Sequence, residues 1–78
     1  MMGRLSEKYV CANGDIWEVW LVVYDNDNYA PGGKDEVTQY KKNGREVGHH
    51  TRHLDKDGNL IHENHYGITT LPDDAQRI

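Results

Sequence analysis

The sequence predicts an all-β protein: a single small domain, folded as a five-stranded antiparallel meander of hairpins that is curled or closed into a small barrel. The first observation is a repeated turn signal at Asn13-Gly14, Asn43-Gly44 and Asp57-Gly58. Such dipeptides favour tight hairpin turns, because both central residues of a type I′ turn need a positive φ. The second observation is the segment 16–24, which reads as a long strand, and the third is that nothing longer than a few residues shows a helical period.

The elements are expected in the following order. A flexible N-terminus, residues 1–6, precedes the first strand at Glu7–Ala12. The second strand, 16–24, is apolar on both faces except at Glu18, which predicts a central place in the sheet with Trp17 or Trp20 buried. The remaining strands are expected at Glu36–Lys42, Arg45–Leu54 and Asn59–Thr70.

Two segments are expected to lack regular structure. The connection at residues 25–34 contains Pro31-Gly32-Gly33, which cannot sustain a strand ladder, and we expect it to be mobile. The β domain is then expected to span residues 7–71. The tail, residues 72–78, begins at a proline and is expected to be loose.

Composition limits the function classes. The chain has 78 residues and a formal charge of −4, which argues against a general nucleic-acid binder, since that role needs a basic face. One alternative is a local basic stripe beside Tyr40, formed by Lys41, Lys42, Arg45 and Arg52. The single cysteine, Cys11, allows no internal disulfide, and no apolar run is long enough to cross a membrane, so we expect a soluble cytoplasmic protein.

All five histidines lie within residues 48–67. If Asp57-Gly58 is a two-residue turn, His53 meets His62 and His50 meets His65 across the hairpin, with Leu54 opposite Ile61 and Arg52 opposite Glu63. Alternation then puts one histidine pair on each face of the sheet, so the histidines do not converge on one ion. A rival register, with a type I turn at 55–58 and a glycine bulge, pairs His53 with Ile61 and His49 with His65.

Metal binding by this cluster is the alternative function. Zinc or another divalent ion would use His50, His53, His62 and His65, with missing ligands from Glu63, His49, Asp25 or Asp27. A response of the net charge to acid is a further alternative, because protonating all five histidines takes −4 to +1. Our main expectation is that the histidines are surface polar residues and that the protein has no cofactor.

Calcium and catalytic patterns are incomplete. Residues 55–59, Asp-Lys-Asp-Gly-Asn, open like an EF-hand loop, but Leu60 and Tyr66 occupy its glycine and glutamate positions. Residues 25–36 have Ala30 at the glycine position, which leaves only a non-standard calcium site. Glu63 beside His62 could act as a general base, but a cross-strand partner for Arg52 is the simpler interpretation.

These observations predict a non-enzymatic binding module that contacts a protein partner. Small proteins of this kind, including those encoded by phages and mobile elements, often regulate or inhibit a larger protein. We expect contact through aromatic and cationic side chains, since these are enriched at interfaces. The expected contact residues are Tyr29, Tyr40, Tyr66, Arg45 and Arg52. A homo-oligomer could form through an exposed strand edge.

Overall fold

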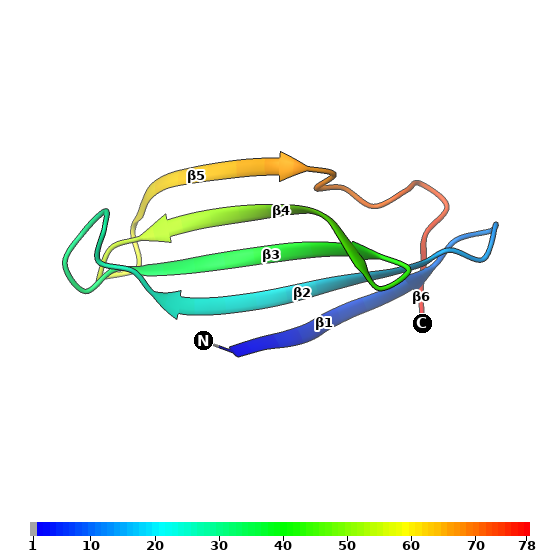
Figure 1. Ribbon diagram of the computed structural model, residues 1–78, viewed down its shortest axis with the longest axis horizontal. Helices are drawn as coiled ribbons and strands as arrows, with labels where there is room; N and C mark the ends of the chain where they lie inside the picture. Colours follow the sequence, from blue (N-terminus) through cyan, green and yellow to red (C-terminus); the bar gives the residue numbers. More distant parts are fainter. Residues whose placement is uncertain (1) are drawn as a thin grey trace.

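The computed structural model describes residues 2–78. Its six strands are β1 (Met2–Val10), β2 (Ile16–Asp25), β3 (Lys34–Lys42), β4 (Arg45–Leu54), β5 (Leu60–Gly67) and β6 (Gln76–Arg77). They form one antiparallel sheet in the order β5-β4-β3-β2-β1-β6 (Figure 1). The prediction of a small all-β domain with an antiparallel sheet is confirmed. The sheet has six strands rather than the five predicted, because β6 returns to pair with β1, and it is not closed into a barrel, because β5 and β6 are its two unjoined edges.

The strand β2 lies inside the sheet, as predicted. It pairs with β1 on one side and with β3 on the other. Trp17, on this strand, has only 4% of its surface exposed, whereas Trp20 is half-buried. The apolar residues on both faces of β2 therefore fit a strand that has a neighbour along each edge and side chains packed on each face.

Both ends of the chain depart from the prediction. The strand β1 begins at Met2 rather than Glu7, so residues 2–6, predicted to be flexible, belong to the sheet. The tail is not loose along its length, because Gln76–Arg77 pairs with β1 as a sixth strand. The tail runs from the end of β5 to the opposite edge of the sheet (Figure 1), where the Ile78 N–H donates to the Lys8 carbonyl over 3.0 Å.

Register divides the side chains between two faces, because directly paired residues in an antiparallel sheet point to the same side. We call one side the hollow face, because it contains a shallow hollow that Val22 and Val37 help to line. Along the inner strands this face carries Trp20, Val22, Tyr24, Asp35, Val37, Gln39, His49, Thr51 and His53. The other side, the Trp17 face, carries Trp17, Val19, Leu21, Thr38, Tyr40, His50 and Arg52. Buried apolar residues lie on both, with Trp17 and Val19 on one face and Val22 and Val37 on the other.

The connection between β2 and β3, residues 26–33, has no regular structure, as predicted, but it is internally bonded. Asp25 and Lys34, which were predicted to belong to it, pair with each other at the ends of the two strands instead. The Asn26 N–H donates to the Gly33 carbonyl over 3.0 Å, and the Gly32 N–H donates to the Asp27 carboxylate over 3.1 Å. A side chain at Gly33 would come within 2.7 Å of the Leu54 carbonyl oxygen, which explains the glycine. The loop is thereby held against the end of β4, and its mobility stays a prediction.

Candidate functional site

The β4–β5 hairpin distributes its histidines over both faces. His53 pairs with His62 and His50 pairs with His65, which confirms the histidine pairs of the favoured register. The turn itself is the one expected from the rival register, since the Gly58 N–H donates to the Asp55 carbonyl over 3.0 Å. A bulge after Leu60 restores the favoured pairing.

One detail of the prediction is therefore wrong. Leu54 lies opposite Leu60 rather than Ile61, because Ile61 is the extra residue of the bulge. The alternative metal set of His50, His53, His62 and His65 is divided between the two faces of the sheet, as the favoured pairing predicts, so these four residues do not surround one point.

A buried polar cluster occupies the hollow face beside the β2–β3 loop. The His53 ring, 6% exposed, and the Asp35 carboxylate, 2% exposed, are joined by a bond of 2.6 Å between Nδ1 and Oδ1. The other oxygen of Asp35 accepts a hydrogen bond from the Asn26 amide at 2.9 Å. Burial alone would raise the pKa of Asp35, but the hydrogen bonds from Asn26 and His53 outweigh it and the pKa is lowered.

Aromatic stacking closes this cluster. The Tyr29 ring lies on the His53 ring, with centroids 4.0 Å apart and an angle of 28° between the planes. The outer nitrogen of His53, Nε2, lies 3.4 Å from the Asn64 amide. Both ring nitrogens thus have partners, and one ring face is covered. Through Asn26 and Tyr29, these contacts attach the β2–β3 loop to Asp35 on β3 and to His53 on β4.

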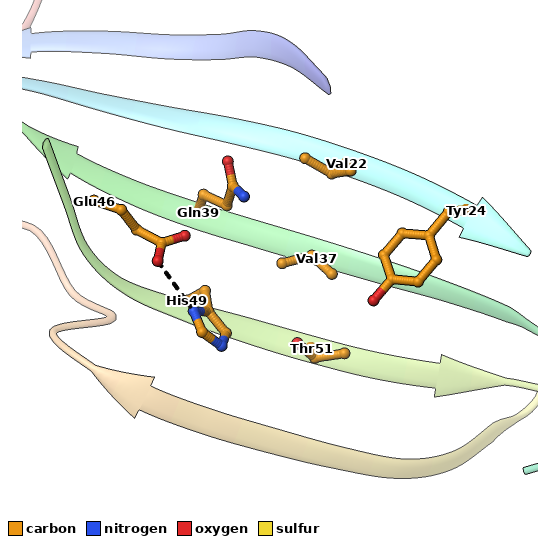
Figure 2. A pocket seen from close by; sticks show the side chains of 7 residues that line it. All are labelled: Val22, Tyr24, Val37, Gln39, Glu46, His49 and Thr51. Atoms are coloured by element: carbon orange, nitrogen blue, oxygen red, sulfur yellow. Dashed lines mark ion pairs between the residues drawn. The ribbon is translucent and has the colours of Figure 1, made fainter. Parts of the chain in front are cut away.

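A shallow hollow of about 260 Å³ lies next to that cluster on the same face (Figure 2). Val22 and Val37, both buried, are cross-strand partners in its lining, with Val37 on the middle strand β3 and Val22 on β2 at one margin. The other lining side chains are polar or aromatic: Tyr24, Gln39, Glu46, His49 and Thr51. Glu46 and His49 face each other at one end, with 3.5 Å between carboxylate and Nδ1. The hollow is an apolar patch with hydrogen-bonding groups around it.

A second cluster lies on the Trp17 face of the same hairpin. The His50 Nε2 and the Glu63 Oε2 are 2.8 Å apart, and the His50 and His65 rings stack with centroids 4.0 Å apart and planes 8° apart. The hydrogen bond with His50 is the main cause that lowers the pKa of Glu63. The three residues each offer one ligand atom, and these atoms lie within 4.8 Å of one another.

The residues predicted to contact a partner fall on both faces. Tyr29 stacks on His53, and Tyr66, 68% exposed, stacks on His49 with centroids 5.3 Å apart, so both lie on the hollow face. Tyr40, Arg45 and Arg52 lie on the Trp17 face, where Arg52 forms an ion pair of 3.0 Å with Glu36. The five residues do not share one surface. The predicted basic stripe is likewise divided, because Lys41 lies over the Trp20 ring on the hollow face, 4.4 Å from the ring centre.

The acidic loop segments use their carboxylates within their own turns. Asp55 Oδ1 accepts the N–H groups of Asp57 and Asn59, each at 2.9 Å, and the bond from Asn59 is the main cause that lowers the pKa of Asp55. Asp27 similarly accepts from Gly32. These bonds close the turns locally, as Asx turns do.

Comparison of the chain with protein-family models, with curated proteins and with solved structures finds no match. Among residues 2–78 there is no helix of the length and apolarity needed to cross a membrane. The geometry of the two faces is thus the basis for any functional proposal.

Proposed function

We propose that this chain is a small non-enzymatic binding module, and that a protein partner docks on its hollow face. The observation that carries the proposal is the apolar patch at Val22 and Val37, ringed by polar and aromatic groups on an uncovered stretch of sheet. Interfaces combine an apolar centre with such a rim. In this role the chain would regulate or inhibit the larger protein that it binds.

The size of the hollow favours a protein side chain over a small molecule. Its volume of about 260 Å³ is below the roughly 300–1,000 Å³ that is usual for ligand pockets. Exposed apolar surface continues beyond the hollow on both sides. Towards the β1 edge of the sheet lies Leu5, which is 44% exposed and pairs with Trp20, and towards the β5 edge lies Tyr66. A broad, shallow and partly aromatic surface is suited to a macromolecule.

Charge indicates the kind of partner. The chain carries a formal charge of −4, and the exposed Glu46 carboxylate stands at the rim of the hollow. Lys41, its cross-strand neighbour, lies over the Trp20 ring. We therefore propose a partner that places an apolar side chain in the hollow, against Val22 and Val37, and a cationic side chain near Glu46.

The buried histidine supports a non-enzymatic role. A general base must reach the proton that it removes, within about 2.6–3.2 Å or through one water. His53 is 6% exposed, is bonded to Asp35 and lies under Tyr29. The most tightly hydrogen-bonded histidine and carboxylate on the hollow face are thus committed to holding the loop.

The test is affinity capture from a native lysate with two neighbouring charge reversals. Glu46→Lys changes the rim of the hollow, whereas Arg45→Glu changes the opposite face at the adjacent position. We expect a protein that is captured by the wild-type chain and by Arg45→Glu, and lost with Glu46→Lys. A captured set that is unaffected by Glu46→Lys, or that depends on Arg45 instead, would contradict the proposal. If the wild-type chain self-associates on a size-exclusion column and Glu46→Lys abolishes this, the partner on the hollow face is a second copy of the chain rather than another protein.

A further inference from the structure

The cluster on the Trp17 face has the arrangement of a three-ligand metal site. His50 and His65 are directly opposite on adjacent strands, and Glu63 lies two residues before His65, so strand alternation turns all three to one side. One ligand atom from each residue already lies within 4.8 Å of the other two. Two rigid strands and the cross-strand pairing therefore hold the three donors close together.

We propose that His50, Glu63 and His65 bind one divalent transition-metal ion of the zinc type. Imidazole nitrogen and carboxylate oxygen are ordinary zinc ligands, and three protein ligands with an open fourth position are typical of sites that retain a water. The fourth position here would face solvent, because Glu63 and His65 are exposed on the edge strand β5.

Only a small movement is needed to close the ligand set. Metal–ligand bonds of about 2.0–2.1 Å in a tetrahedral site put the ligand atoms about 3.3 Å apart. In the structure the three ligand atoms lie within 4.8 Å of one another. The His50 Nε2 and Glu63 Oε2 are already 2.8 Å apart. The His65 side chain is exposed, so its ring can rotate out of the stack with His50 without displacing a core residue.

Local charge favours a cation at this point. With neutral imidazoles the three ligands carry one negative charge, that of Glu63. A bound divalent ion would therefore leave the site with a net charge of only +1. The cation directly opposite Glu63 on the neighbouring strand is Arg52, which forms an ion pair with Glu36 at 3.0 Å. The guanidinium is therefore already paired, and Glu63 is bonded to His50 instead.

The other histidines form no part of this site. His53 and His62 lie on the hollow face, where the His53 Nδ1 is bonded to Asp35 and the His62 Nε2 lies 3.0 Å from the Asn64 side-chain oxygen. This gives a matched control within one strand, because His62 and His65 are both exposed residues of β5 that point to opposite faces.

The experiment is a titration of the full chain with zinc, followed by the ring signals of the histidines in NMR spectra. We expect saturation at one equivalent, with the signals of His50 and His65 shifted and that of His53 unchanged. Cobalt in place of zinc should give the visible absorption bands of a four-coordinate site. His65→Ala and Glu63→Gln should weaken binding at least about tenfold, since even outer-shell partners of a metal contribute 10–100-fold.

The control and the contrary results are equally defined. His62→Ala should leave zinc affinity within about twofold of the wild-type value, because it removes no ligand. Absence of saturable binding up to about 1 mM zinc would overturn the proposal, and so would an equal loss of affinity in His62→Ala and His65→Ala. The site lies on the face opposite the hollow, so loss of metal binding and loss of partner capture are separable outcomes.

Discussion

Replacing Asp35 with asparagine tests the buried cluster that fixes the β2–β3 loop. The carboxylate accepts from His53 on one oxygen and from the Asn26 amide on the other. An asparagine keeps the shape and one acceptor, but its NH₂ group would face the NH₂ group of Asn26. The variant therefore loses the negative charge and leaves one donor without an acceptor.

The expected cost follows from burial. A hydrogen bond to a charged group contributes roughly 1.5–3 kcal/mol, and an unsatisfied buried donor costs about 1–3 kcal/mol, so we expect a loss of about 2–4 kcal/mol. A domain of 78 residues is stable by only about 4–12 kcal/mol. The loss should lower the melting temperature by about 8–32 °C, since each kcal/mol corresponds to roughly 4–8 °C in a domain of this size.

Urea denaturation followed by the fluorescence of Trp17 and Trp20 measures this loss. The matched control is Asp73→Asn, at an exposed position, which should change the free energy of unfolding by less than about 0.5 kcal/mol. If Asp35→Asn is as stable as Asp73→Asn, the reasoning is refuted and the Asp35–His53 bond does not hold the loop.

Three further predictions concern pH, glycine and cysteine. The lowered pKa of Asp35 gives a stabilisation that is present above the unfolded pKa of about 3.9 and is lost as pH falls through the folded pKa. The stability difference between wild type and Asp35→Asn should therefore stay constant at neutral pH and shrink as the pH falls below about 4 in acid titrations. Gly58→Ala should cost about 1–2 kcal/mol for its positive φ alone. Gly48→Ala should cost more in the same denaturation assay, because its Cβ would collide with the backbone of Ile68, and equal costs would be contrary evidence. Cys11 is 7% exposed, and burial raises the pKa of its thiol, so its alkylation at pH about 8 should be much slower in the folded chain than in urea. Equal rates in the two conditions would show that the fold does not protect this thiol.

Local sequence signals predicted the inner strands well. Residues 16–24, with apolar side chains on both faces, became the inner strand β2, and the fourth strand has the predicted bounds Arg45–Leu54. The Asn43-Gly44 turn also formed, with positive φ at both residues. These elements depend on periodicity and turn chemistry, which neighbouring residues determine.

Contacts distant in sequence were not predicted. The pairing of Gln76–Arg77 with β1 joins the two ends of the chain, and its polar residues give no strand pattern. Asp35 and His53 are 18 residues apart, and each looks like a surface residue until the register places one opposite the other. The signal that could have indicated the pair is Asp35 itself, two positions from Val37 on the buried side of β3.

The hairpin register shows how local and distant constraints combine. The turn at Asp55–Gly58 has the longer form, yet the histidine pairs are those of the shorter one. The bulge at Ile61 reconciles them, and it returns Arg52 to its place opposite Glu63. Sequence alone offered the two registers as exclusive alternatives, because a compensating bulge has no clear residue signature.

The most direct test of docking on the hollow face is photo-cross-linking in a native lysate. A benzophenone amino acid placed at Tyr66 reports on the hollow face, and the same group at Arg45 reports on the Trp17 face. We predict a discrete protein adduct from position 66 that is suppressed by excess unlabelled wild-type chain and not by Glu46→Lys. An adduct from position 45 and none from position 66 would contradict docking on the hollow face.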